Sequence, residues 1–327
     1  MKILITGATG FIGTWVTKSL LDRGHDIRVI SRSGTANFHF PSEKIEVVRA
    51  DITNQDSLTK AFQDVDSVFH LAGLIGYSRA MRQQMVTTNV VGTQNVVESC
   101  LKARCRRLVY MSSVVAIGAS FDGASPLNEN SKYELHDLNL GYFETKHRAE
   151  KIVSEAVTAG KIDAVILNPS TIYGPGDAKK GSRSTQVKVA QGKFPVYTSG
   201  GVNVVHIHDV VNAAYRAWEI GRSGERYILA GENILIHDLF KHIAEAAGVP
   251  PPRIYLPNPV VHTLGKVGDF LETKGIKTPL NSETAWTSTL FHWFDNSKAK
   301  RELSLNPTSA KKAIGESVLW MKEHGVI

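Results

Sequence analysis

Residues 2–13 have the sequence KILITGATGFIG, in which a short apolar run leads directly into a glycine-rich turn. The run predicts a buried β-strand, and Ile12, Val16 and Leu20 recur at the spacing of one helix face. Glycine at such a junction permits a tight turn and lets backbone N–H groups approach a pyrophosphate at the start of the helix. The pattern therefore predicts a dinucleotide-binding site, with a tight turn of no further role as the alternative. The residues assigned to this site are Gly7, Thr9, Gly10, Phe11, Ile12 and Gly13.

Strand-like and helix-like segments alternate through the rest of the first half. Strands are predicted at residues 26–31, 45–50, 65–72, 107–112 and 163–168, and helices at residues 57–62, 82–103 and 142–158. Such alternation is typical of parallel strands joined by helices that cover both faces of the sheet. The predicted fold class is therefore α/β, with a doubly wound parallel sheet.

The pattern changes after Pro169, where glycine, lysine and serine become more frequent and prolines interrupt the later helices. Two strand-like segments, residues 204–207 and 226–230, flank a predicted helix at residues 209–220. We therefore expect a nucleotide-binding domain and a smaller, mainly helical C-terminal lobe that binds substrate. The expected boundaries are residues 1–169 for the domain, with residues 204–231 returning to it, and residues 170–203 and 232–327 for the lobe.

The composition is that of an ordinary globular protein, with 42% hydrophobic and 21% charged residues among 327. The formal net charge is +7, but the basic residues are scattered and no aromatic residues lie between them, which argues against a nucleic-acid partner. The sequence contains no run of about 18 apolar residues and no signal-peptide pattern. We therefore expect a cytoplasmic protein with no membrane partner.

Metal and disulfide chemistry have no clear signal in the sequence. The two cysteines, Cys100 and Cys105, are too few for a disulfide framework, and we expect both to be reduced. His206 and His208 lie two residues apart on a predicted strand, which would put both on one face. No third ligand accompanies them, so no metal site is predicted.

The residues that follow the second strand bear on the choice of cofactor. Ser31 and Arg32 stand where NAD-binding proteins place a carboxylate that accepts from the ribose 2′-hydroxyl. An arginine instead suits the 2′-phosphate of NADP, because its guanidinium can form charge-assisted hydrogen bonds to phosphate oxygens. We therefore predict NADP as the cofactor, with NAD as the alternative.

Two further strand ends lie on the same predicted edge of the sheet, where open α/β sheets bind ligands. Asp51 and Ile52 follow the third strand. Leu71, Ala72 and Gly73 follow the fourth strand. We assign all five residues to the cofactor site, although Asp51 would serve equally well as a turn or helix-capping residue.

Tyr142 and Lys146 lie four residues apart, on one face of the predicted helix at residues 142–158. A nearby ammonium favours phenolate and lowers the pKa of a tyrosine, which would make Tyr142 a general acid for carbonyl reduction or a base for alcohol oxidation. Ser113, at the end of the fifth strand, would hold the substrate oxygen beside it. Taken alone, Tyr142 and Lys146 would be ordinary residues of a helix surface, and Ser113 would be an ordinary turn residue. Asn89, on the long helix, would satisfy a buried network or cap a bend.

In combination, these motifs resemble those of the extended short-chain dehydrogenase/reductase family, the NAD(P)-dependent epimerase/dehydratase group. The matching segments are residues 6–13, Asp51-Ile52, residues 70–73, Ser113, Tyr142-x-x-x-Lys146, Asn168-Pro169, residues 173–177, residues 205–210 and residues 295–303. The resemblance spans nearly the whole chain and implies a Rossmann fold. It implies that Ser113 orients the carbonyl, Tyr142 transfers the proton and Lys146 binds the nicotinamide ribose. It also adds Asn89, Pro169 and Thr171 to the expected cofactor contacts.

Within this family, the chain looks most like the dihydroflavonol reductase-like and hydroxysteroid dehydrogenase-like members. Nucleotide-sugar members usually carry an arginine just before the strand that leads to a His-x-x-Asp motif, and residues 200–206 here, GGVNVVH, contain none. The resemblance thus implies an NADP(H)-dependent oxidoreductase that reversibly reduces a ketone or aldehyde to an alcohol. A nucleotide-sugar epimerase or dehydratase and a non-catalytic NADP-binding redox sensor are the alternatives. Family members often form homodimers, so a homodimer is a further expectation.

Overall fold

The computed structural model describes residues 1–176, 184–276 and 278–327. Its largest element is a parallel sheet of seven strands in the order β10-β6-β5-β4-β1-β2-β3. The strand order reverses between β1 and β4, and the crevice at such a reversal is where open α/β sheets bind ligands. The strands are β1 (Lys2–Thr6), β2 (Asp26–Ser31), β3 (Glu46–Arg49), β4 (Ser67–His70), β5 (Arg107–Met111), β6 (Ala164–Pro169) and β10 (Arg226–Leu229).

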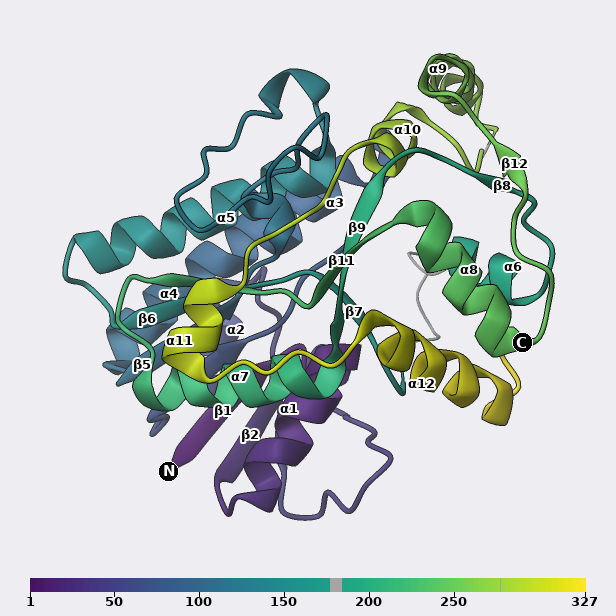
Figure 1. Ribbon diagram of the computed structural model, residues 1–327. Helices are drawn as coiled ribbons and strands as arrows, with labels where there is room; N and C mark the ends of the chain where they lie inside the picture. Colours follow the sequence, from purple (N-terminus) through teal and green to yellow (C-terminus); the bar gives the residue numbers. More distant parts are fainter. Residues whose placement is uncertain (177–183, 277) are drawn as a thin grey trace.

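Helices cover both faces of this sheet. Because alternate residues of a strand point to opposite sides, each central strand contributes side chains to two cores. Ile3 and Ile5 of β1 belong to the core that includes residues of α1 and α7, whereas Leu4 belongs to the core that includes residues of α2, α4 and α5. Figure 1 shows α1 and α7 together on one side of the sheet and α4 and α5 on the other. The two cores confirm the predicted α/β class. These helices are α1 (Phe11–Asp22), α2 (Gln55–Ala61), α4 (Gly92–Ala103), α5 (Gly141–Thr158) and α7 (Ile207–Ile220).

The long helix predicted at residues 82–103 is present, with a change in its hydrogen-bond pattern. A π-helical turn, η2 (Val86–Val91), lies between α3 (Arg82–Met85) and α4. Such turns are rare and often occur at functional sites. This one contains Asn89, whose side chain is buried.

The second half of the chain contains a separate three-stranded sheet in the order β11-β9-β7. The strand predicted at residues 204–207 belongs to β9 (Gly201–His206), which pairs with β7 (Thr171–Tyr173) and β11 (Glu232–Leu235). The prediction that His206 and His208 share a strand is wrong. His206 ends β9 and caps α7, so His208 lies in the helix.

The remaining helices and two short strands lie in the second half of the chain, and three 3₁₀ helices lie in the loops of the first half. The helices are α6 (Ser184–Ala190), α8 (Ile236–Ala247), α9 (Asn258–Thr273), α10 (Ser282–Thr289), α11 (Ser297–Leu303) and α12 (Ala310–Glu323). The short strands β8 (Val196–Tyr197) and β12 (Ile254–Tyr255) pair with each other. The 3₁₀ helices are η1 (Arg79–Met81), η3 (Val114–Ala116) and η4 (His136–Leu138).

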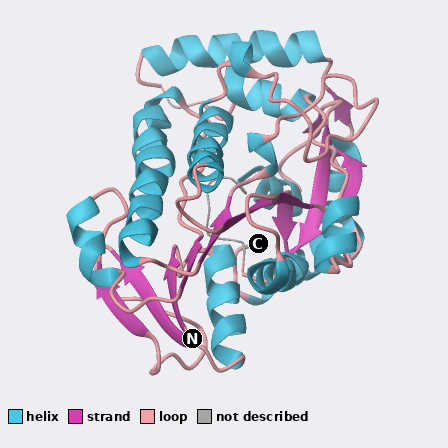
Figure 2. Ribbon diagram, turned by 90° about the vertical axis from the view of Figure 1, so that its left-hand side faces the viewer, coloured by secondary structure: helices cyan, strands magenta, loops and turns pink. Residues whose placement is uncertain are grey.

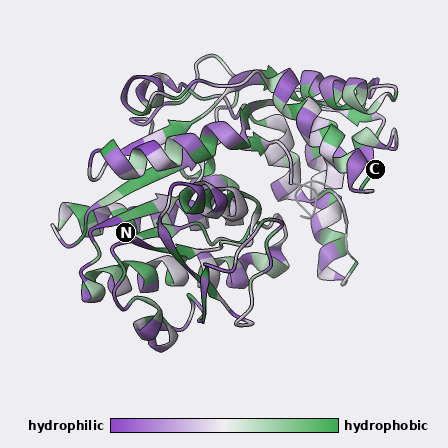
Figure 3. Cartoon of the chain, turned by 90° about the horizontal axis from the view of Figure 1, so that it is seen from below, coloured by the Kyte–Doolittle hydropathy of each residue, from purple (hydrophilic) through white to green (hydrophobic). Residues whose placement is uncertain are grey.

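Burial follows these layers. Figure 2 shows the strands in magenta beside the cyan helices, and Figure 3 shows the central strands mostly green, the colour of hydrophobic residues. Strands covered on both faces are expected to be apolar throughout, and all residues of β4 and β6 are buried. Within the described ranges, no helix combines the length and the apolar character needed to cross a bilayer.

Candidate active site

The turn between β1 and α1 leaves no room for a side chain at two of its glycines. The backbone of Gly7 has φ +70°, and a Cβ atom there would lie 2.7 Å from the Ala72 nitrogen. A Cβ atom on Gly13 would lie 2.0 Å from the Gly7 carbonyl oxygen. Gly10 caps α1 without a side chain, so no side-chain oxygen occupies the N–H groups of the first helical turn. The turn thus presents N–H donors at a helix N-terminus, an arrangement that fits a pyrophosphate.

A buried histidine holds the ends of β1 and β4 together. Nδ1 of His70 lies 2.7 Å from the Thr6 hydroxyl, and Nε2 lies 3.1 Å from the Thr93 hydroxyl. The Thr93 hydroxyl donates to the carbonyl of Asn89, so its oxygen accepts from Nε2 of His70. Burial lowers the pKa of His70 to about 3. The Thr6 oxygen also accepts from the Ala72 N–H at 3.2 Å, which fixes the turn after β4 against the turn after β1.

The predicted cofactor residues at the neighbouring strand ends are engaged to different degrees. Arg32, directly after β2, is exposed, and its guanidinium has no hydrogen bond or ion pair with any residue that the structure describes. The Ser31 hydroxyl donates to a carbonyl of the following loop at 2.6 Å. Oδ1 of Asp51 accepts from the N–H and the hydroxyl of Thr53, both at 2.9 Å. Asp51 therefore serves the turn, which is one of its two predicted roles, and Arg32 is available to a ligand.

Tyr142 and Lys146 lie on the buried face of α5, with only 7% and 5% of their surface exposed. The Lys146 ammonium donates to the Met111 carbonyl at 2.9 Å, which ties α5 to the end of β5. Ser113 comes two residues after that strand and caps η3. The structure therefore brings together the phenol, the ammonium and the hydroxyl that the sequence predicted as catalytic.

The pKa of Tyr142 departs from its ordinary value in the direction opposite to the sequence prediction. Burial raises it, the neighbouring Tyr77 adds to the rise, and hydrogen bonding by Ser113 opposes it. The Lys146 ammonium, four residues further along α5, donates to a backbone carbonyl of β5. A phenol in this environment keeps its proton at neutral pH, which suits a proton donor.

Lys146 has the reverse shift. Burial lowers its pKa to about 8, and the charge of Glu150, one helical turn further along α5, acts to raise it. The amine is therefore still mostly protonated at pH 7, but it loses its charge at mildly alkaline pH.

Asn89 and Gly73 complete the same side of the site. The Asn89 side chain accepts from the Leu74 N–H at 2.7 Å and donates to the Leu74 carbonyl at 2.9 Å and to the Thr145 hydroxyl at 3.1 Å. A Cβ atom on Gly73 would lie 3.5 Å from both Asn89 Oδ1 and Lys146 Nζ. The turn after β4, the π-helical turn and α5 therefore meet at one point, and Asn89 satisfies the buried network that the sequence analysis offered as one of its roles.

The other predicted cofactor residues lie around this point or at its margin. Pro169 is buried at the end of β6, and Thr171 is half-buried at the start of β7. Ile52 is buried against Gly92 at the start of α4, and Leu71 is half-buried after β4. The remaining predicted residues of the glycine turn are Thr9, which is exposed, and Phe11 and Ile12, which are half-buried at the start of α1.

Several residues near the catalytic phenol were not predicted. Tyr77 lies edge-on to Tyr142 with 6.2 Å between ring centres. Trp286 of α10 belongs to the same largely apolar cluster, so the C-terminal lobe contributes to the surroundings of the phenol. Glu150 is buried one turn beyond Lys146. Only Glu150 had a signal in the sequence, its spacing of four from Lys146; Tyr77 and Trp286 meet the site through tertiary contacts.

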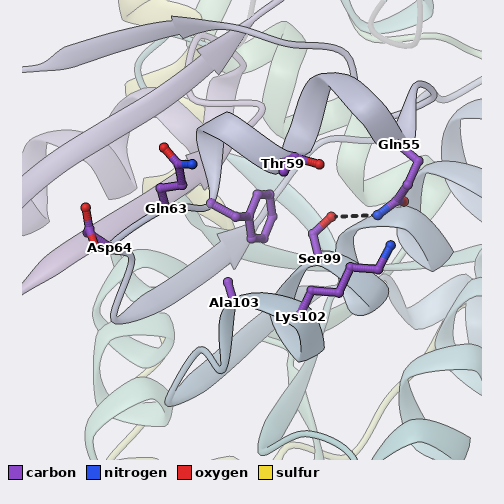
Figure 4. Close-up of a pocket in the computed structure, with 8 residues that line it drawn as sticks. Gln55, Thr59, Gln63, Asp64, Ser99, Lys102 and Ala103 are labelled. Atoms are coloured by element: carbon purple, nitrogen blue, oxygen red, sulfur yellow. Dashed lines mark hydrogen bonds between the residues drawn. The ribbon is translucent and has the colours of Figure 1, made fainter.

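A pocket elsewhere on the surface is separate from this site. It lies between α2 and α4, where Gln55 donates to the Ser99 hydroxyl at 3.1 Å (Figure 4). None of the predicted site residues lines it. Among the described residues, no group of three or more His, Cys, Asp or Glu side chains is arranged to hold a metal ion.

Comparison with known proteins identifies the family. The sequence model of the NAD-dependent epimerase/dehydratase family matches residues 3–230, which include the glycine turn, Tyr142 and Lys146. The chain belongs to this family. Family membership and relatives named as reductases and dehydrogenases make it an NAD(P)-dependent oxidoreductase of the extended short-chain dehydrogenase/reductase type.

Two relatives of this epimerase/dehydratase family member cover nearly its full length. A protein of Synechocystis sp. that carries the provisional name dihydroflavonol 4-reductase is 30% identical over 99% of this chain and 95% of its own. Sterol demethylase protein B of Methylococcus capsulatus is 30% identical over 100% of both chains.

Solved structures agree on the fold. The crystal structure of a protein designated gox2253 is similar with a TM-score of 0.87 and 33% identity, covering 99% of this chain and 98% of that one. UDP-glucose 4-epimerase of Thermus thermophilus in complex with NAD has a TM-score of 0.78 at 19% identity, covering 98% of this chain and 99% of its own. At that identity the likeness shows a shared fold only.

Proposed function

We propose that this protein is an NADP(H)-dependent reductase that reversibly converts a ketone or aldehyde of modest polarity into an alcohol. The observation that carries the proposal is the group formed by the buried Tyr142 and Lys146 and the half-buried Ser113 beside Gly73, at the reversal point of the sheet. A protonated phenol, a hydroxyl and an ammonium at that place match the needs of carbonyl reduction, in which the carbonyl oxygen must gain a proton.

The cofactor site fits a dinucleotide on the evidence of its backbone. Glycines 7 and 13 have no space for a Cβ atom, and the start of α1 has no capping side chain. The N–H groups there would hold the pyrophosphate, and the exposed guanidinium of Arg32 would hold a 2′-phosphate. Bound NADPH would supply the hydride.

The chain's own residues would then orient the substrate and supply the proton. The Ser113 hydroxyl would hold the carbonyl oxygen, and Tyr142 would donate its proton to that oxygen as negative charge develops there. The Lys146 ammonium would hold the nicotinamide ribose and stabilise the resulting phenolate. Burial of Tyr142 and Lys146 would keep bulk water from the reacting atoms.

The surroundings of the phenol favour a substrate of low charge. Tyr142 packs in a cluster made mainly of apolar side chains. The segment that carries an arginine in nucleotide-sugar enzymes corresponds to β9 and its preceding glycine, and every residue of β9 is buried. A sugar diphosphate would find no cation there, whereas two relatives carry names that refer to a dihydroflavonol and a sterol, which are both uncharged molecules. We assign the cofactor to residues 1–169 and 204–231, and the substrate to residues 170–203 and 232–327.

The proposal is tested by NADPH oxidation across a panel of aromatic, alicyclic and steroidal ketones and aldehydes, with NADH in parallel. We expect net NADPH consumption, and Tyr142→Phe should lower kcat by about 10²–10⁴-fold while NADPH affinity stays within about twofold. Tyr255→Phe, which removes an exposed phenol on β12, is the matched control and should be unaffected.

Other outcomes would assign a different function. Isomerisation of a UDP- or GDP-sugar without net cofactor consumption would identify a nucleotide-sugar epimerase. NADPH binding without turnover of any substrate, unchanged in Tyr142→Phe, would identify a redox sensor. Full activity of Tyr142→Phe would refute the assigned proton donor.

A further inference from the structure

Glu150 is a buried carboxylate that the proposed reaction does not use. It lies on α5 one helical turn beyond Lys146, and 6% of its surface is exposed. An ionised side chain is rarely buried this deeply unless several partners compensate its desolvation.

Three side chains from three different strand ends donate to this carboxylate. Oε2 of Glu150 accepts from the Ser112 hydroxyl at 2.5 Å and from Nδ2 of Asn168 at 2.7 Å. Oε1 accepts from Nη1 of Arg226 at 3.2 Å. The carboxylate thus joins the ends of β5 and β6 to the start of β10.

One of these partners leads directly to the predicted catalytic serine. The Asn168 amide donates to Glu150 and also to the backbone carbonyl of Ser113 at 3.0 Å. Its Oδ1 atom has no partner among the described residues, although the whole side chain is buried. The amide therefore turns both its donors toward the carboxylate and the Ser113 segment, which is the orientation that an ionised Glu150 demands.

The same carboxylate lies one helical turn from Lys146 on α5, and both residues are buried. Burial acts against the charge of the Lys146 ammonium, and Glu150 is the charged group that supports it. The charged and titratable groups around this pair are Tyr142 on α5, Tyr110 on β5, whose ring lies 5.4 Å from Lys146 Nζ, the neutral His70 on β4, and Arg226 on β10. Arg226 is the one cation among them that contacts the carboxylate, so it offsets part of the charge that reaches Lys146.

We propose that Glu150 is a positioning residue for the active site, which keeps Lys146 charged and holds the Ser113 backbone through Asn168. This role rests on the proposed function, since a charged Lys146 matters for turnover only if Tyr142 donates the proton. Arg226 then weakens the effect of Glu150 on the pKa of Lys146, because its guanidinium forms an ion pair with the same carboxylate.

The electrostatic role makes a prediction that a merely structural role does not. Glu150→Gln removes a negative charge near Lys146, so the pKa of Lys146 should fall. Arg226→Gln removes a positive charge next to Glu150, so the pKa of Lys146 should rise. A structural network would lose order in both variants, and the two would not shift the lysine in opposite directions.

The first experiment needs no substrate and no cofactor. Lysine labelled with ¹³C at Cε is incorporated biosynthetically, and the Lys146 signal, assigned by its loss in Lys146→Arg, is followed from pH 6 to 11. We expect its midpoint to fall by about one pH unit in Glu150→Gln and to rise in Arg226→Gln. Glu150→Asp keeps the charge and should restore most of the shift.

A matched control removes a carboxylate from the same helix. Glu155 is exposed on α5 and faces Lys151 at 3.7 Å, so Glu155→Gln should leave the Lys146 titration unchanged. The thermal unfolding midpoint of each variant is measured alongside, so that a variant that fails to fold is recognised. If Glu150→Gln fails to fold, the other two variants still test the electrostatic role. The pKa of Lys146 should rise in Arg226→Gln and stay near the parent value in Glu150→Asp.

The second experiment applies the same variants to turnover. Since loss of the Lys146 charge should end activity as the pH rises, the alkaline limb of the kcat profile should move by the same amount and in the same direction as the NMR midpoint. A Lys146 titration that is unchanged in Glu150→Gln, or that moves the same way in both charge variants, overturns the inference. An NMR shift as expected, in a protein that reduces no carbonyl on the panel, would support the coupling of Glu150 to Lys146 and reject the proposed function instead.

Discussion

Arg32 stands at the point where the two candidate cofactors differ, at the end of β2 and free of partners among the described residues. A guanidinium bound to a 2′-phosphate forms charge-assisted hydrogen bonds worth about 1.5–3 kcal/mol. Arg32→Asp replaces this donor with a carboxylate, which repels a phosphate and accepts from a ribose hydroxyl. We expect the Kd for NADPH to rise about 10- to 100-fold and the Kd for NADH to stay level or fall, as measured by fluorescence titration.

The control for this substitution is Arg104→Asp. Arg104 is also exposed, but it ends α4, and its left-handed backbone is one that aspartate tolerates. This variant should leave both cofactor affinities unchanged. An NADPH-to-NADH preference that Arg32→Asp does not alter would remove the 2′-phosphate contact from the proposal.

At the scale of elements, α10 of the C-terminal lobe meets the start of the helix that carries Tyr142. Oε1 of Glu283, a buried residue of α10, accepts from Arg82 at 2.7 and 3.0 Å. Its Oε2 atom accepts from the Gly141 N–H at 3.2 Å, in the first turn of α5. A carboxylate at a helix N-terminus also interacts favourably with the helix dipole. Glu283 thus connects the lobe to the catalytic helix.

Glu283→Gln keeps the size of the side chain and removes its charge. Because Arg82 is partly exposed and water compensates some of the loss, we expect the free energy of unfolding to fall by about 1–2 kcal/mol in urea titrations. Glu245→Gln, an exposed carboxylate of α8 that lies 3.6 Å from His242, should change it by less than about 0.5 kcal/mol. Equal losses in the two variants would mean that the Glu283 contacts add nothing to stability.

The elements also show what the sequence could and could not predict. The strands and helices of the first half follow from apolar runs and helical spacing, and their predicted ends differ from the observed ones by at most two residues. The helix expected to start at Ser57 starts at Gln55, because the side chain of Asn54 caps it through the N–H groups of Asp56 and Ser57. The strands β8 and β12 have two residues each, too short for any periodicity to be visible.

The site divides in the same way. Tyr142 and Lys146 could be paired from the sequence because the helix itself sets their spacing. The neighbours Tyr77 and Glu283 could not, since each reaches the start of α5 from a distant part of the chain. The direction of the pKa shift of Tyr142 was also out of reach, because it depends on burial and not on the residue four positions away.

At the scale of the whole molecule, two histidines kept neutral by burial make stability depend on pH. Burial lowers the pKa of His70, the last residue of β4, to about 3, and that of His292, in the C-terminal half, to about 4. The unfolded chain binds protons at these residues near pH 6.5, whereas the folded chain does not. Stability should therefore be complete above pH 6.5 and fall as the pH drops below it, until the folded pKa values are reached.

Between pH 6.5 and 5, His70 alone should lower the free energy of unfolding by about 2 kcal/mol, since each pH unit costs about 1.4 kcal/mol. Glu46, Glu225 and Asp295, whose pKa values are lowered by their partners, remain ionised over this window and add little to the slope. Urea unfolding at pH 7.5, 6.5, 5.8 and 5.0 measures the effect. His70→Gln should be less stable at pH 7.5, because it loses the contacts to Thr6 and Thr93, and its stability should vary less with pH. An unchanged slope in that variant would show that the acid sensitivity of the fold arises from other groups.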